Sequence, residues 1–183
     1  MVRRVFRGVP TLMVEPQASK RGYLEQVRAD LPEVRYASQV LSARAGETVT
    51  FYEMETGSSF LPEQSNAARR TTQMTTSTLD NIAADVPGNS LFLKIDVQGA
   101  ELQVLNGGAK TLERARVVQL ETALLPYNKG APSVLEVLSY MEVRGFHPFD
   151  LSGFSRVQGH LVQVDILFAR RDDTALRPDF INF

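Results

Sequence analysis

The sequence has no cysteine, and this absence excludes several kinds of chemistry. Disulfide bonds, a thiolate nucleophile and zinc bound by cysteine are excluded, and a reducing compartment is favoured, so we expect a cytoplasmic protein. Histidine is also scarce. His147 and His160 are the only two histidines, and they do not stand at the His-x-x-x-His spacing of a helical metal site. We therefore expect no metal ion.

An excess of charge of one sign is missing as well. The chain has 20 basic and 21 acidic residues, so it lacks the bulk basic field that holds nucleic acid or an anionic membrane. No apolar run reaches the roughly 18 residues of a membrane span, and the first residues lack the apolar core of a signal peptide. We expect neither nucleic acid nor a membrane as partner. With 183 residues, the chain is expected to form a single domain, residues 1–183.

Apolar strands alternate with amphipathic helices along the chain. Strands are predicted over residues 11–15, 34–41, 48–53, 91–96, 117–122, 146–151 and 161–169. Helices are predicted over residues 19–30, 78–85, 100–113 and 133–145, and Ser133 with Glu136 forms a capping box at the start of the last one. The polar segment 57–76 is predicted to be a long loop. This alternation predicts a mostly parallel, doubly wound sheet.

One run, LFLKIDVQGAELQVLNGGAKTL at residues 91–112, indicates where a ligand binds. A predicted apolar strand ends at Asp96, and a helix-forming stretch opens just after Gly99. Ligands in open α/β folds bind outside the carboxyl ends of the parallel strands, so we expect the site beside Asp96. The pair Gly107–Gly108 interrupts the helix and indicates a bend or close packing rather than a phosphate loop.

This run resembles the FkbM family of S-adenosylmethionine (SAM)-dependent methyltransferases, which carries K-I-D-x-E/Q-G-x-E after a buried strand, followed by V-L and G-A. The matching residues are Lys94, Ile95, Asp96, Gln98, Gly99, Glu101, Val104, Leu105, Gly108 and Ala109. Shorter matches follow in the family's order, among them V-E-P at 14–16, T-L-D at 78–80 and Q-L-E at 119–121. The resemblance covers about residues 9–171 and implies a Rossmann-like, doubly wound, mostly parallel sheet of the class I SAM methyltransferase type.

The sequence departs from the family pattern at its beginning. The family opens with a strand and a turn of the type D-x-G-A-N-x-G, which lets the backbone approach the methionine part of SAM closely. None of the 12 glycines here is separated from another by a single residue. We weigh three explanations: the chain is a piece of a longer polypeptide, strands 11–15 and 91–96 pair directly, or residues 2–6 supply a strand. An open slot in the sheet would favour association, so we expect a homodimer.

The resemblance also suggests roles for individual acids. Glu15 is expected to bind the ribose hydroxyls of SAM, because a carboxylate accepts two hydrogen bonds in a fork. Asp96 is expected to face the SAM amino group or the acceptor, and Glu121 is a candidate acid on the acceptor side. The alternative for each is a plain strand-end carboxylate, or for Asp96 an acid placed before a helix N-terminus. Glu101 is a member of the site or an acid placed in the first helical turn by the helix dipole, and we weigh the two equally. Asp165 is expected to have a structural or a substrate-side role.

Methyl transfer is an in-line displacement, for which the enzyme positions donor and acceptor and can remove a proton. The resemblance implies transfer from SAM to an oxygen of a small-molecule or sugar acceptor, with nitrogen as the second choice. The alternative is a non-catalytic remnant of the fold that serves as a binding or assembly module.

Overall fold

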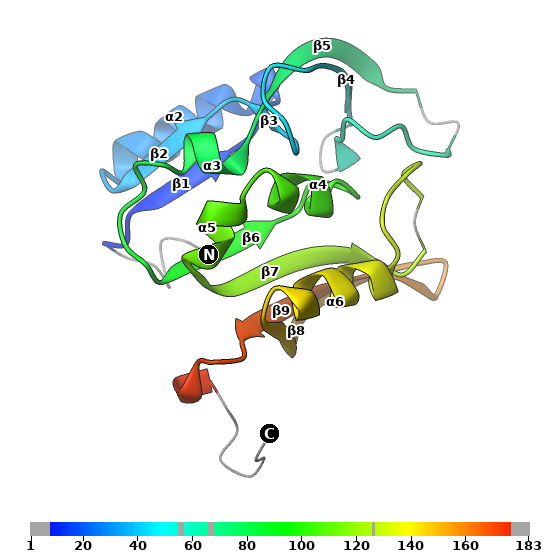
Figure 1. Ribbon diagram of the computed structural model, residues 1–183. Helices are drawn as coiled ribbons and strands as arrows, with labels where there is room; N and C mark the ends of the chain where they lie inside the picture. Colours follow the sequence, from blue (N-terminus) through cyan, green and yellow to red (C-terminus); the bar gives the residue numbers. More distant parts are fainter. Residues whose placement is uncertain (1–7, 55–56, 66–67, 126, 177–183) are drawn as a thin grey trace.

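The chain forms three separate β-sheets in the computed structural model (Figure 1). The structure describes residues 8–54, 57–65, 68–125 and 127–176. The first sheet pairs β1 (Thr11–Val14) with β2 (Val34–Ala37) in parallel. The 3-10 helix η1 (Ala18–Lys20) and helix α2 (Arg21–Asp30) connect these two strands. The second sheet has the order β3-β5-β4, formed by β3 (Val40–Leu41), β4 (Thr48–Glu53) and β5 (Arg70–Ser77).

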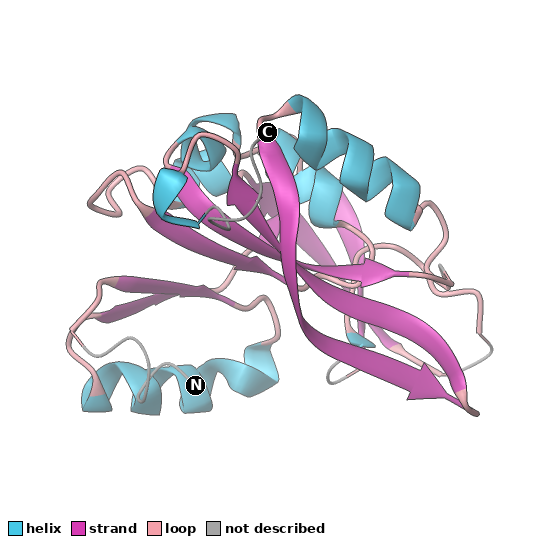
Figure 2. Cartoon of the chain, turned by 90° about the horizontal axis from the view of Figure 1, so that it is seen from below, coloured by secondary structure: helices cyan, strands magenta, loops and turns pink. Residues whose placement is uncertain are grey.

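The third sheet is the largest and has the order β6-β7-β9-β8. Its strands are β6 (Leu91–Ile95), β7 (Ala115–Ala123), β8 (Phe146–Val157) and β9 (His160–Arg170). Its helices are α3 (Leu79–Ile82), α4 (Glu101–Asn106), α5 (Ala109–Glu113) and α6 (Val134–Val143), and a short 3-10 helix, η3 (Thr174–Leu176), follows β9. Figure 2 shows these α-helices gathered on one side of the strands, while α2 lies on the other side, against the β1–β2 pair.

The prediction of one doubly wound, mostly parallel sheet is wrong. Parallel pairing joins β1 to β2, β3 to β5 and β6 to β7, whereas β4–β5, β7–β9 and β8–β9 are antiparallel. The β8–β9 hairpin has a local cause. Gln158 and Gly159 both have positive φ, at 49° and 84°, and they form the two-residue turn between the paired residues Val157 and His160. Such a turn requires antiparallel strands.

Direct pairing between the strands at residues 11–15 and 91–96 was one explanation for the missing glycine turn, and it is also wrong. In the ladders of the described residues, β1 pairs with β2 and β6 pairs with β7, and the two pairs belong to different sheets. The strand considered for residues 2–6 lies outside the described residues.

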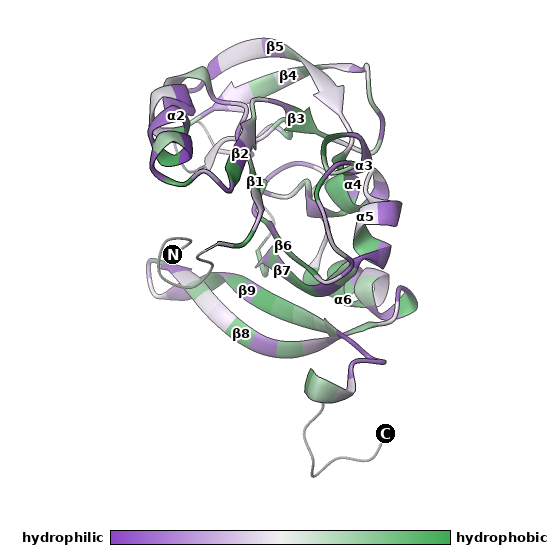
Figure 3. Ribbon diagram, turned by 90° about the vertical axis from the view of Figure 1, so that its left-hand side faces the viewer, coloured by the Kyte–Doolittle hydropathy of each residue, from purple (hydrophilic) through white to green (hydrophobic). Residues whose placement is uncertain are grey.

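The main core lies between the third sheet and its helices. Val118 and Leu120 of β7 are fully buried there, together with Phe168 of β9 and Met141 of α6. Because side chains of a strand alternate between its two faces, Gln119 and Glu121 of β7 point to the opposite face. Figure 3 shows that β9 is largely apolar, whereas β8 mixes polar and apolar residues. The acids of the third sheet thus lie away from its apolar core.

Local signals in the sequence predicted several details correctly. Ser133 and Glu136 form the predicted capping box, with the Glu136 side chain accepting from the Ser133 N–H at 2.7 Å. The predicted loop over residues 57–76 is wrong in its second half, because residues 70–77 form β5. That strand, RTTQMTTS, has almost no apolar periodicity, and its threonines favour a strand through their branched side chains. In the described ranges, no helix is both long enough and apolar enough to cross a membrane.

Gly107 confirms the predicted close packing. A Cβ at Gly107 would lie 2.2 Å from the backbone carbonyl oxygen of Ser42, which links the α4–α5 bend to the end of β3. The structure has no room for a side chain at this position.

We predict that Gly107→Ala lowers the free energy of unfolding by about 1–3 kcal/mol, because backbone atoms must shift to admit the methyl group. The matched control is Gly22→Ala in α2, where a Cβ would meet nothing within 4 Å. This control should be neutral or stabilising by up to about 1 kcal/mol, since alanine is the better helix former. Urea denaturation measures both variants, and equal effects would contradict the close packing.

Candidate functional site

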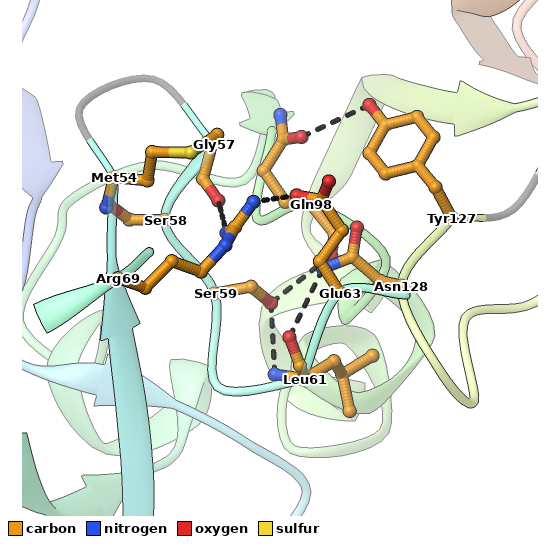
Figure 4. Close-up of polar contacts among 10 residues, drawn as sticks. All are labelled: Met54, Gly57, Ser58, Ser59, Leu61, Glu63, Arg69, Gln98, Tyr127 and Asn128. Carbon is orange, nitrogen blue, oxygen red and sulfur yellow. Dashed lines mark hydrogen bonds and ion pairs between the residues drawn. The ribbon is translucent and has the colours of Figure 1, made fainter. Parts of the chain in front are cut away.

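Two acids from neighbouring parallel strands meet at the carboxyl end of β6. The register pairs Ile95 of β6 with Leu120 of β7, so Asp96, which follows β6, lies next to Glu121. The side-chain amide of Gln98 joins them. Its Nε2 donates to Asp96 Oδ1 at 3.2 Å and, through a short hydrogen bond, to Glu121 Oε2. The hydroxyl of Tyr127 donates to Gln98 Oε1 at 3.4 Å, as Figure 4 shows. All three parts of the Gln98 amide, the two N–H donors and the carbonyl, are therefore engaged.

The turn that carries Gln98 has an unusual backbone. Gln98 has φ 54° and Gly99 has φ 96°, a left-handed pair that a non-glycine residue rarely adopts. A Cβ at Gly99 would lie 2.6 Å from the Cβ of Ala131, so the turn also packs tightly against the segment after β7. The sequence places glycine where both the conformation and the space require it.

The buried side chain of Glu101 binds backbone N–H groups of this turn. Its carboxylate Oε1 accepts the backbone N–H of Val97 at 3.2 Å and of Gly99 at 3.0 Å, and only 3% of the residue is exposed. Burial raises the pKa of Glu101 above its usual value, although these backbone donors oppose the shift. The structure therefore places the Glu101 carboxylate against the turn's backbone.

The two acids of the site titrate differently. Burial raises the pKa of Glu121 to about 8, and the charges of Asp96, Glu101 and Asp165 add to the rise. Burial by itself would raise the pKa of Asp96 as well. The Lys94 ammonium, 2.8 Å from Asp96 Oδ2, and the Gln98 amide outweigh this effect and keep the pKa of Asp96 below its usual value. Near neutral pH the pair thus holds one carboxylate, at Asp96, and one proton, at Glu121.

A third acid and a tyrosine border this pair. Asp165 of β9 is the register partner of Glu121, and a Cβ on Gly153 of β8 would lie 2.6 Å from Asp165 Oδ2. The Asp165 carboxylate therefore occupies the space that a side chain at Gly153 would fill. Burial, followed by the charge of Glu121, raises the pKa of Tyr127 to about 12, which keeps its hydroxyl protonated as a hydrogen-bond donor. Within the described residues, no group of three or more histidine, aspartate or glutamate side chains is arranged to hold a metal ion.

Glu15 lies apart from these acids. It directly follows β1 in the first sheet, where its N–H donates to the carbonyl of Ala37 at 3.0 Å and its Oε1 accepts the N–H of Gln17 at 2.8 Å. Of the three acids predicted for the site, the structure therefore brings together Asp96 and Glu121 and leaves Glu15 in another sheet. Its role toward ribose stays a prediction.

The residues that the sequence reasoning missed are those that hold the acids in place. Gln98 was interpreted only as a variant of the family pattern, yet its amide is the link between the two carboxylates. Ser59 donates to the carbonyls of Val97 and Gln98, which lie 38 and 39 positions later in the chain. No local pattern indicates such a contact, because it depends on where the β4–β5 connection lies in space.

In the comparison with known families, residues 7–148 match the Methyltransferase FkbM domain. The chain belongs to the FkbM methyltransferase family. The matched range contains the whole turn at residues 96–101 and both acids of the site. Searches of curated proteins and of solved structures found no match. The resemblance of the run at residues 91–112 is thus confirmed at the level of the family.

The raised pKa of Glu121 makes the stability of this FkbM-family chain depend on pH. In the unfolded chain the carboxyl loses its proton near its usual pKa, whereas the folded chain keeps it to about pH 8. The contribution of Glu121 to the free energy of unfolding is therefore fully present at acidic pH and is lost as the pH rises to about 8. We predict that the free energy of unfolding falls less steeply between pH 5 and 8 in Glu121→Gln than in the unsubstituted chain.

Urea denaturation at several pH values measures this difference. The matched control is Glu113→Gln at the exposed end of α5, which should leave the slope unchanged. Identical slopes for the chain and for Glu121→Gln would contradict the shifted pKa.

Proposed function

We propose that this FkbM-family chain transfers a methyl group from SAM to a hydroxyl oxygen of a small molecule or sugar, with an amine nitrogen as the second choice of acceptor atom. The observation that carries the proposal is the pair of unlike acids, Asp96 and Glu121, which Gln98 joins at the carboxyl end of β6 within the matched domain. Asp96, which is ionised, is suited to hold a cation. Glu121 is suited to accept a proton once it has lost its own, which it does near pH 8.

The acidic residues suit the positive charge of SAM. SAM supplies an electrophilic methyl carbon on a positively charged sulfur, and it also carries an ammonium group. Asp96 is ionised and its side chain is 40% exposed, so its carboxylate can bind such a cation while Lys94 holds it in position. Glu15 would accept hydrogen bonds from two ribose hydroxyls, in the manner of strand-end carboxylates.

Glu121 is suited to the proton step on the acceptor side. An acceptor hydroxyl loses its proton as its oxygen forms the new bond, and a general base works best when its pKa lies near the operating pH. The pKa of Glu121, about 8, lies near neutral pH. The deprotonated form, whose share grows as the pH rises toward 8, is the form that can accept the proton. Gln98 and Tyr127 keep the carboxyl group oriented through their chain of hydrogen bonds.

A second candidate function is a non-catalytic binding or assembly module. The observation in its favour is that β1, and with it Glu15, belongs to a different sheet from β6 and Asp96. In the family pattern these strands flank the strand that carries the glycine turn, and no two glycines of the sequence are separated by a single residue. A chain of this kind would keep the acids without binding SAM.

Calorimetric titration with SAM separates the two candidates. We predict that the chain binds SAM and that Asp96→Asn weakens binding roughly ten- to a hundredfold, because a hydrogen bond to a charged group contributes about 1.5–3 kcal/mol. Asp85→Asn is the matched control, since Asp85 is an exposed aspartate paired with Arg35 of β2, outside the site. Absence of heat at millimolar SAM would reject the enzyme proposal for this chain and favour the binding module.

A further inference from the structure

The segment 57–65, which follows β4, is joined to both loops of the candidate site. At its start, Ser59 forms an antiparallel bridge with Tyr52 of β4, with N···O distances of 2.8 and 3.1 Å. Three hydrogen bonds connect the segment to residues after β7: Gln64 N to Tyr127 O at 2.8 Å, Lys129 N to Pro62 O at 2.8 Å and Asn128 Nδ2 to Leu61 O at 3.1 Å. The segment is thus fixed between the second sheet and the loop that carries Tyr127.

Ser59 connects this segment to the turn of Gln98. Its hydroxyl lies 3.1 Å from the carbonyl oxygens of both Val97 and Gln98 and donates between them, while it accepts the N–H of Leu61 at 3.1 Å. Only 2% of Ser59 is exposed, so water does not compete for these carbonyls. The hydroxyl therefore holds the backbone on one side of the left-handed turn, and Glu101 holds the backbone N–H groups on the other.

The segment itself depends on a buried ion pair. Arg69 and Glu63 form a close ion pair with side chains that are only 6% and 15% exposed, and Arg69 Nη1 also donates to the carbonyl of Gly57 at 2.9 Å. Arg69 therefore connects the two ends of the segment, at Gly57 and at Glu63. Figure 4 shows its guanidinium group between these partners, beneath the side chain of Gln98. Loss of one member would leave the other charge buried without its counter-ion.

We propose that Arg69 is a positioning residue of the candidate site. By binding Glu63 and Gly57 it fixes the segment 57–65, and the Ser59 hydroxyl of that segment fixes the turn that holds the Gln98 amide between Asp96 and Glu121. The hydrogen bond and the ion pair of Arg69 join it to Gly57 and Glu63 and not to either acid. Its importance for methyl transfer rests on the proposed function, whereas its effect on Gln98 does not and is measurable without SAM.

The experiment compares the side-chain NH₂ signal of Gln98 in nitrogen-15 NMR spectra, identified by its loss in Gln98→Ala. In Arg69→Leu we expect this signal to move to the position of solvent-exposed glutamine amides. We also expect hydrogen exchange at the amides of Leu61 and Gln64 to become about tenfold faster, because the segment opens locally. The position of the Gln98 signal reports the geometry of the folded site, which a general loss of stability does not change, whereas hydrogen exchange also responds to stability.

Two controls separate positioning from stability. Arg70→Gln replaces the exposed neighbouring arginine and should leave the Gln98 signal in place. Arg114→Leu removes an arginine that binds the carbonyls of Ala83 and Gly88, away from the site, and should lower stability without moving the signal.

An unmoved Gln98 signal in a folded Arg69→Leu chain overturns the proposal, even if exchange in the segment becomes faster. If Arg69→Leu does not fold, Ser59→Ala decides, since it removes the hydroxyl and keeps the backbone bridge to Tyr52. Movement of the signal in Ser59→Ala supports the proposal, and an unmoved signal overturns it. Failure of SAM to bind in calorimetry would reject the proposed function and leave this result unaffected.

Discussion

The hydrogen bonds from the Gln98 amide to two carboxyl groups are the interaction on which the rest of the site depends. Two carboxylates on neighbouring strands repel each other, and burial increases the repulsion. The structure resolves this conflict by keeping a proton on Glu121 and a charge on Asp96, with Lys94 beside the charge. The amide then serves both groups, because it donates one N–H to each.

Such an arrangement requires a rigid turn. Gln98 has a left-handed backbone, which costs free energy unless the surroundings hold it. Three contacts hold it: Glu101 binds the N–H groups, Ser59 binds the carbonyls, and Gly99 lies against Ala131. Glu101 belongs to the same run as the turn, whereas Ser59 and Ala131 come from distant parts of the chain. The second sheet and the segment 57–65 therefore belong to the support of the site, although neither carries one of its acids.

The sequence predicted the parts of this site that follow from local rules. Asp96 and Glu121 are neighbours because Asp96 follows β6, Glu121 lies near the carboxyl end of β7, and the two strands pair in parallel. The alternation of apolar and polar residues in the sequence indicates these strands and their ends. The division into three sheets was not predictable in the same way, because strand pairing depends on contacts between distant segments. The turn at Gln158 and Gly159 was the one local signal for the antiparallel hairpin, and the expectation of a parallel sheet overlooked it. No local pattern in the sequence predicts the ion pair between Arg69 and Glu63.

The most direct test of the account is a carbon-13 NMR titration of the side-chain carboxyl groups of Asp96 and Glu121. The account predicts that Glu121 titrates with a midpoint near 8 and that Asp96 titrates below the usual range of aspartate. Two ordinary midpoints near those of free aspartate and glutamate would contradict it. In that case the two acids would not share the Gln98 amide as a singly charged pair.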